Sequence, residues 1–268
     1  MTAGTAARLE RIGTGGRHLI VPMDHGITLG AVDGLVDIES TIDAVTRGGA
    51  DAVLTQKGIA PRVHDNRNDA GYIVHCNGST AIGPDESDKR PTATVEEAIR
   101  AGADAVSFHI NVGSEHEPDQ ITQLSELAAE ADRYGMPLLA MTYARGHDIR
   151  DDDPETFAED LGHAVRLGEE LGADVLKTAY SGTAETFERV VESTRLPVVI
   201  AGGSKGTDEE TLSMVRGAMD AGAAGVSMGR SIFQHEDPEA ITEAVAAVVH
   251  DDASAADAVE RAGLAVEA

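Results

Sequence analysis

The stretch Leu171-Gly-Ala-Asp-Val-Leu-Lys-Thr-Ala-Tyr180 joins the end of a predicted helix to a short apolar strand that contains one lysine. Glycine commonly ends helices, and the residues that follow are mostly aliphatic. Because side chains alternate along a strand, Val175, Lys177 and Ala179 share one face. The stretch therefore predicts a strand that presents a lysine on its inner face.

The same junction recurs before other predicted strands. Its copies are Gly49-Ala-Asp-Ala-Val53, Gly102-Ala-Asp-Ala-Val106, Gly172-Ala-Asp-Val-Leu176 and Gly222-Ala-Ala-Gly-Val226. They fall at every second strand of a βα series, either as a repeat or because any helix-to-strand turn favours such residues. Both interpretations support eight βα units, which predict an α/β fold: a single (β/α)8 TIM barrel with parallel strands and its site at their C-terminal ends.

Apolar runs and helix signals give the order of the elements. Strands are predicted at residues 18–24, 51–57, 72–76, 104–110, 137–143, 173–180, 197–201 and 225–228. Capping boxes at 94–97 and 207–210, and Asp-Pro pairs at 153–154 and 237–238, predict helix starts. Asn77 to Pro91 is predicted to be a long loop. An open doubly wound sheet is the alternative, but Met23-Asp-His-Gly26 is not the glycine-rich phosphate loop that it requires.

The length of 268 residues suits one domain, predicted over 1–268, with a leading helix within 1–16 and a tail helix within 251–268. No apolar run approaches the roughly 20 residues of a membrane span, and residues 1–16 lack a signal-peptide core. The single Cys76 excludes an internal disulfide and suggests a reducing compartment. We expect a cytoplasmic protein without membrane contacts.

The chain is strongly acidic, with a formal net charge of −26 and 47 acidic residues against 21 Lys and Arg. This pattern is typical of halophilic surfaces, because concentrated salt screens the self-repulsion. It argues against nucleic acids and anionic membranes as partners. A phosphorylated substrate would need backbone N–H groups and a few cations close to it.

Only four lysines occur, and three of them, Lys57, Lys177 and Lys205, lie at or just beyond predicted strand ends. Inside a barrel, burial disfavours the charged form of an amine, and only a neutral amine attacks a carbonyl carbon. The structural alternative is that Lys177 reaches solvent or pairs with a carboxylate. Its occurrence in so lysine-poor a chain favours a chemical role.

Two polar residues end other predicted strands. Asp24 follows the first strand and Tyr143 ends the fifth, so both face the predicted mouth. Schiff-base chemistry requires groups that deliver and remove protons, although each residue alone is compatible with a structural role. A lysine with both neighbours predicts a covalent-lysine site.

Glycine turns follow the seventh and eighth strands, at Gly202-Gly-Ser-Lys205 and Gly229-Arg-Ser231. Barrels often bind phosphate at these loops, because glycine lets the backbone approach an anion and a short helix follows. Two ordinary turns are the alternative. We expect Gly202, Gly203, Ser204, Lys205, Gly229 and Arg230 to bind phosphate.

A zinc-dependent mechanism is the rival, since His25, His75 and His109 lie at or near strand ends. No His-x-x-x-His or His-x-Glu cluster supports it. We predict no metal and no cofactor beyond the lysine imine.

Five ordered motifs resemble the archaeal-type class I aldolases of the fructose-bisphosphate and deoxyribose-phosphate aldolase superfamily. They are Val21-Pro-Met-Asp-His-Gly26, Met141-Thr-Tyr-Ala-Arg-Gly146, Val175-Leu-Lys-Thr178, Gly202-Gly-Ser-Lys205 and Met228-Gly-Arg230. The resemblance runs from Leu19 to about Val249. It implies that Lys177 forms the Schiff base, that Asp24 and Tyr143 act as acid and base, and that Arg230 and the glycine turns hold phosphate. Arg145 and His25 are expected to contact substrate.

Three further segments resemble the branch of 2-amino-3,7-dideoxy-D-threo-hept-6-ulosonate synthases: Met23-Asp-His-Gly-Ile-Thr28, Gly34-Leu-Val-Asp-Ile38 and Val106-Ser-Phe-His-Ile-Asn-Val-Gly113. The resemblance implies transfer of a three-carbon unit from 6-deoxy-5-ketofructose 1-phosphate to L-aspartate semialdehyde, on the archaeal route to 3-dehydroquinate and aromatic amino acids. Ala144 and Ser204 stand where the family often has proline. His109 and His147 are candidate contacts of the acceptor.

Several alternatives stay open from the sequence. The first is a class I fructose-1,6-bisphosphate aldolase, which shares the lysine, the base and the phosphate turns. The others are a phosphate-binding barrel that isomerises or cleaves without a covalent lysine, and a non-catalytic sugar-phosphate binding protein. The resemblance also implies a homo-oligomer, with a decamer of two rings as one form.

Overall fold

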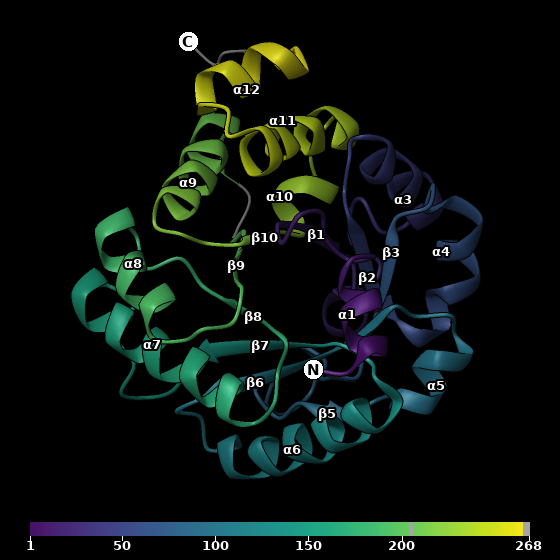
Figure 1. The fold of residues 1–268 in the computed structure, drawn as a ribbon, viewed down its shortest axis with the longest axis vertical. Helices are drawn as coiled ribbons and strands as arrows, with labels where there is room; N and C mark the ends of the chain where they lie inside the picture. Colours follow the sequence, from purple (N-terminus) through teal and green to yellow (C-terminus); the bar gives the residue numbers. More distant parts are fainter. Residues whose placement is uncertain (204–205, 265–268) are drawn as a thin grey trace.

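The computed structural model describes residues 1–203 and 206–264, and within them eight parallel strands close a barrel. Around the barrel the order is β1-β10-β9-β8-β7-β6-β3-β2, as Figure 1 shows. The strands are β1 (His18–Pro22), β2 (Ala52–Gln56), β3 (Gly71–His75), β6 (Ala105–Val112), β7 (Leu138–Ala144), β8 (Val175–Thr178), β9 (Val198–Ala201) and β10 (Gly225–Ser227). The predicted TIM barrel is confirmed.

Helices surround the barrel and cover its outer face (Figure 1). They are α1 (Ala3–Leu9), α2 (Gly26–Leu29), α3 (Ile38–Arg47), α4 (Ala60–Asn66), α5 (Val95–Arg100), α6 (Glu117–Tyr134), α7 (Pro154–Glu170), α8 (Ala184–Glu192), α9 (Asp208–Asp220), α10 (Arg230–Phe233), α11 (Pro238–Asp251) and α12 (Ala255–Ala262), with a 3₁₀ turn η1 (Lys57–Ile59). None of the helices in the described ranges is both long and apolar enough to cross a membrane.

The capping signals in the sequence form as predicted. Thr94 and Thr207 each complete a capping box with the glutamate three residues later. Asp153 and Asp237 each accept a backbone hydrogen bond at a helix start that has proline as its first residue. These contacts satisfy N–H groups that the first helical turn leaves free, so the helix starts are fixed locally.

The repeated Gly-Ala-Asp junction has a physical basis in the structure. Its four glycines all have positive φ, from 75° at Gly102 to 96° at Gly49, a conformation that other residues rarely adopt. In three copies, the aspartate accepts an N–H bond from the first residues of the neighbouring strand: Asp51 from Leu19 (2.6 Å), Asp104 from Tyr72 (3.0 Å) and Asp174 from Leu138 (3.0 Å). In these three copies, the junction therefore ties the helix end to the adjacent strand.

Three regions differ from the sequence-based expectation. The loop from Asn77 to Pro91 is closed at its base by a short antiparallel pair, β4 (Asn77–Gly78) with β5 (Arg90–Pro91). Strand β6 continues to Val112 rather than Ile110, because Asn111 and Val112 pair with Tyr143 and Ala144 of the long strand β7. A short helix, α2, also replaces the loop expected after β1.

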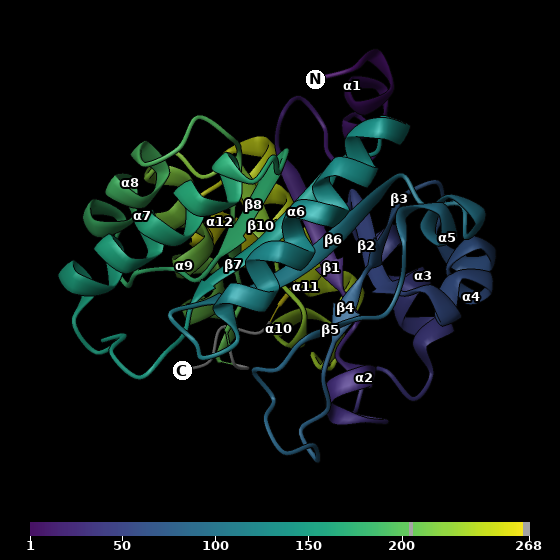
Figure 2. The ribbon, with the colours of Figure 1, turned by 90° about the horizontal axis from the view of Figure 1, so that it is seen from below.

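The barrel has one apolar end and one polar end. At the end next to α1, fully buried side chains fill the interior, among them Ile20, Ile73, Leu139 and Val175, and Ile12 packs against them. Figure 2 shows α1 at this end and α2 with the β4–β5 loop at the opposite one. Because the strands run toward α2, that opposite end carries the residues at the strand C-termini.

Candidate active site

A cavity of about 550 Å³ opens at the C-terminal ends of the strands. It is lined by the predicted site residues Asp24, His25, Tyr143, Arg145, Lys177, Gly202, Gly203, Gly229 and Arg230. Ser204 and Lys205 lie outside the described residues, so their predicted role in phosphate binding is not described. The fold thus gathers residues from β1, β7, β8, β9 and β10 into one site.

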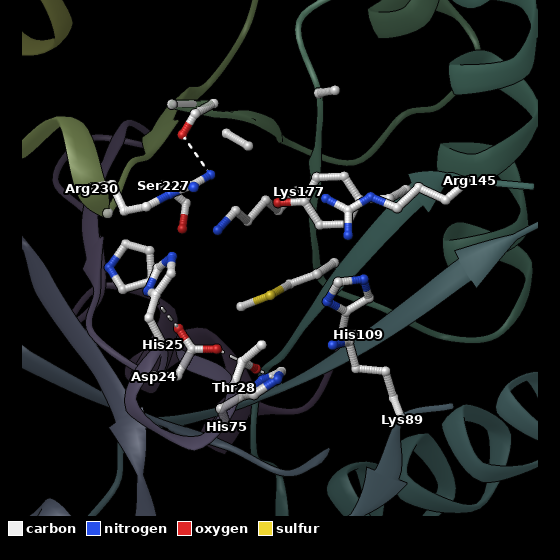
Figure 3. Close-up of a pocket in the computed structure, with 18 of the residues that line it drawn as sticks. Asp24, His25, Thr28, His75, Lys89, His109, Arg145, Lys177, Ser227 and Arg230 are labelled. Atoms are coloured by element: carbon white, nitrogen blue, oxygen red, sulfur yellow. Dashed lines mark hydrogen bonds and ion pairs between the residues drawn. The ribbon is translucent and has the colours of Figure 1, made fainter. Parts of the chain in front are cut away.

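Lys177 lies near the middle of this cavity (Figure 3). Its strand, β8, pairs with β7 at Met141 and with β9 at Val199, which fixes the direction of the side chain into the barrel. The residue is only 5% exposed. The expectation that Val175 and Lys177 face inward is confirmed, since Val175 belongs to the inner cluster while Leu176 packs outside.

Asp24 follows the end of β1 and lies below Lys177 in Figure 3. Its carboxylate oxygens lie 3.6 Å from His75 Nε2 and 3.8 Å from His25 Nδ1. Burial raises the pKa of Asp24, but the attraction of His75, His25 and Lys177 outweighs burial and leaves the pKa below its usual value. Asp24 is therefore ionised at neutral pH and can accept a proton.

His75 supports Asp24 from β3. Burial lowers the pKa of His75 to about 4 despite the opposing effect of Asp24. His75 Nδ1 lies 2.8 Å from the Ser107 hydroxyl, which donates to it when the imidazole proton is on Nε2. The Nε2–H group of a neutral His75 then faces the Asp24 carboxylate.

Tyr143 is held between two nitrogen-bearing groups. The Arg145 guanidinium carbon lies 4.4 Å from the centre of its ring, and the His109 ring centroid is 4.9 Å away. His109 Nε2 is 2.7 Å from Asn111 Oδ1, and burial, with the nearby charges of Lys89 and Arg145, lowers its pKa well below the ordinary value. A neutral imidazole and a cation therefore flank the phenol.

Arg230 and two glycine turns form the opposite wall. Arg230 begins α10 and donates a hydrogen bond of 3.1 Å to the Gly203 carbonyl, while the Ser231 hydroxyl donates to Gly202 at 3.2 Å. Ser227 Oγ and Arg230 Nε are buried without a hydrogen-bond partner in the described part of the chain. Buried polar atoms require partners, so this wall is suited to a polar or anionic group.

Not every candidate histidine belongs to the cavity. His109 lines it, whereas the His147 side chain is 99% exposed beside Asp148 and does not. His25, His75 and His109 are not gathered into one group of metal ligands, since no group of three His, Cys, Asp or Glu side chains that could hold a metal ion occurs within residues 1–203 and 206–264.

Lys89 lines the cavity but was not predicted from its position in the sequence. Lys89 lies near the end of the long polar loop from Asn77 to Pro91, so its position did not follow a predicted strand of the barrel. The scarcity of lysine was its only signal. Ser227 and His75 also line the cavity, and both come from strand positions that alternation places inside the barrel.

The chain is similar to known aldolases over nearly its whole length. Residues 18–235 match the family model described as DeoC/LacD family aldolase. A relative from Halobacterium salinarum named 2-amino-3,7-dideoxy-D-threo-hept-6-ulosonate synthase is 66% identical, over 99% of both chains. A class 1 fructose-bisphosphate aldolase from the same species is 34% identical, over 92% of this chain and 95% of its own.

Solved structures agree with this relationship. An archaeal fructose-1,6-bisphosphate aldolase, whose catalytic lysine is covalently bound to the carbinolamine intermediate of its substrate, superimposes with a TM-score of 0.84. It is 30% identical, over 91% of this chain and 99% of its own. The chain belongs to the DeoC/LacD family of aldolases.

Proposed function

We propose that this chain is a Schiff-base synthase that makes 2-amino-3,7-dideoxy-D-threo-hept-6-ulosonate. It takes a three-carbon unit from 6-deoxy-5-ketofructose 1-phosphate and joins it to L-aspartate semialdehyde. The observation that carries the chemistry is a buried Lys177 inside a cavity that also holds Asp24 and Tyr143. The relative at 66% identity supports the choice of substrates.

In the proposed reaction, Lys177 Nζ attacks a ketone of the donor and forms a carbinolamine, which loses water to give an imine. The imine withdraws electrons, so the bond between the α and β carbons breaks as the β-hydroxyl loses its proton, which leaves an enamine on Lys177 and an aldehyde. Tyr143 exchanges a proton with the oxygen of the aldehyde half, and the ionised Asp24 accepts and returns a proton at the carbinolamine. The enamine then attacks the acceptor aldehyde, and hydrolysis frees the lysine.

The wall opposite Tyr143 is proposed to bind a phosphate next to the imine carbon when fructose 1,6-bisphosphate is the substrate; in 6-deoxy-5-ketofructose 1-phosphate that position is a methyl group, and the single phosphate is on C1. Its groups are Arg230 and the backbone at Gly202, Gly203 and Gly229, with His25 beside them. The unpartnered Ser227 Oγ and Arg230 Nε support this assignment. Positive groups on both sides of Lys177 also suit a bisphosphate, which keeps class I fructose-1,6-bisphosphate aldolase as the second candidate function (Figure 3).

A trapping experiment tests the function. The protein is incubated at high salt with 6-deoxy-5-ketofructose 1-phosphate or fructose 1,6-bisphosphate, reduced with borohydride, and mapped by peptide mass. A Lys177 adduct with the deoxy sugar, with turnover only after addition of aspartate semialdehyde, is the expected result. Triose phosphates released from fructose bisphosphate alone would favour the second candidate. An absence of adducts on Lys177 would contradict both and favour the isomerase or binding-protein alternatives.

The proposal extends to the cellular setting. We expect a cytoplasmic homo-oligomer, for which the family resemblance gives a decamer as one form, acting on the route to 3-dehydroquinate. The buried, unpaired Cys76 agrees with a reducing compartment. Analytical ultracentrifugation in molar salt would measure the oligomeric state, and a monomer at all concentrations would contradict it.

A further inference from the structure

Positive groups lie on two opposite sides of Lys177. In Figure 3, Arg230 is on one side, and Arg145 and Lys89 are on the other with His109. The first side carries the site proposed above for a phosphate next to the imine carbon, a position that is a methyl group in the deoxy donor. The second side lies next to Tyr143, because Arg145 stacks on the Tyr143 ring.

Lys89 is the unexpected member of the second side. It is 6% exposed although it belongs to a loop, and its side chain reaches the cavity (Figure 3). Its ammonium donates a hydrogen bond of 2.8 Å to Ser79 Oγ, and no carboxylate of the described residues lies within ion-pair distance of it. An ammonium has three donors, so Lys89 can still bind an anionic ligand.

The surroundings of Lys89 act on its pKa in both directions and leave the pKa below its usual value. Burial lowers the pKa of Lys89, and the charge of Arg145 acts in the same direction, whereas Glu86 and Asp24 raise it. Glu86 belongs to the same loop and also lines the cavity. Together, Lys89 and Arg145 place two positive groups on one side of Lys177, in a cavity that Glu86 and Asp151 also line.

If the proposed function is correct, the structure of the product indicates that the aldehydes of the reaction lie on the side of Lys89 and Arg145. A 3,7-dideoxy product has a methyl group next to its keto group, so the unit on Lys177 also ends in a methyl group. The donor bond between C3 and C4 therefore breaks, and its electron pair forms the enamine. The C3 hydroxyl proton goes to the acid–base pair, and the phosphate leaves with the C1–C3 aldehyde.

The incoming acceptor takes the place of that aldehyde, since its carbon bonds to the same enamine carbon. We propose that Lys89, together with Arg145, binds the anionic end of both aldehydes in turn: the phosphate of the departing fragment and then the carboxylate of aspartate semialdehyde. The position of Tyr143 supports this assignment, because the aldehyde oxygen must lie within reach of the Tyr143 phenol.

The test uses hydroxyacetone as the donor, since it forms the same enamine on Lys177 without a phosphate. Lys89→Met is assayed with two acceptors, aspartate semialdehyde and propanal, which lacks the carboxylate. We expect the KM for aspartate semialdehyde to rise about 10- to 100-fold, the effect of losing one charged hydrogen bond. The rate with propanal should stay within about two-fold. The KM for the phosphorylated donor should rise as well, and that for hydroxyacetone should not.

Control variants separate binding from a structural role. Lys57→Met removes a lysine that pairs with Glu97 away from the cavity and should leave all four substrates unaffected. Lys89→Arg keeps the charge and should restore most of the affinity for the semialdehyde. Equal losses with propanal and aspartate semialdehyde, or no loss with either, would overturn the proposal. If the wild-type protein forms no Lys177 adduct with hydroxyacetone or with the deoxy sugar, the proposed function itself fails, and this result is obtained before any acceptor is added.

Discussion

The two ends of the barrel interior are built on the same strands but serve different purposes. On β8, Val175 belongs to the apolar end and Lys177, two residues later, lies in the cavity. On β3, Ile73 and His75 show the same change. Apolar burial stabilises the fold, whereas buried polar groups cost solvation free energy unless they are paired. The contrast indicates that the apolar end supplies stability and the polar end supplies chemistry.

The largest expected effect is the loss of activity in Lys177→Met. Without the amine there is no imine, so kcat/KM should fall more than about 1,000-fold. The melting temperature should stay the same or rise, because an apolar side chain replaces a buried amine. Synthase assays and thermal unfolding of the same preparation measure both. A variant that keeps a tenth of the activity would contradict the inference that the polar end supplies the chemistry.

The converse change is Leu139→Ala at the apolar end. Leu139 is fully buried beside Val175, so a cavity should lower the free energy of unfolding by about 3 kcal/mol. The kcat should change little if the apolar end only supports the fold. Urea unfolding gives the first quantity, and Leu139→Met, which conserves volume, is the matched control with a loss below about 1.5 kcal/mol. A loss of activity without a loss of stability would break the comparison.

The polar end should weaken the protein in mild acid. Unfolded His75 binds a proton below about pH 6.5, whereas the folded form binds one only near its lowered pKa of about 4. The free energy of unfolding therefore falls as the pH drops from 6.5 toward 4, by about 2 kcal/mol at pH 5. His75→Gln should flatten the unfolding curve over this range. Parallel curves for the two proteins would show that His75 is not buried in its neutral form.

The smallest expected effect is that of salt on the acidic outer surface, which lies outside both ends of the barrel interior. Raising the salt concentration from about 0.1 M to 1 M shortens the Debye length from about 10 to 3 Å and screens the net charge of −26. We expect the melting temperature to rise by at least about 3 °C, which is about 1 kcal/mol for a chain of this size. An unchanged melting temperature would contradict the interpretation as a salt-adapted surface. Comparing NaCl with KCl checks that screening, rather than one ion, is responsible.

Much of the barrel could be predicted because its signals are local. Strand alternation predicted the inward direction of Lys177, and threonine and aspartate side chains predicted the helix starts at Thr94 and Asp153. The end of β6 was predicted too early, at Ile110 instead of Val112, because Asn111 joins the strand only through its pairing with Tyr143. Such pairings bring together residues more than 30 positions apart, and no local pattern records them.

By itself, the sequence determined the order of the elements, the inner face of each strand and the residue types at the strand ends, because these depend on periodicity and local hydrogen bonds. Only the tertiary structure decided which of these side chains meet. Closure of the barrel brings His75 to Asp24 and His109 onto Tyr143, and the β4–β5 pairing closes the base of the loop that brings Lys89 into the cavity. No periodic pattern in the sequence predicts the burial of Lys89, because that burial depends on the conformation of the loop and on its packing against the cavity.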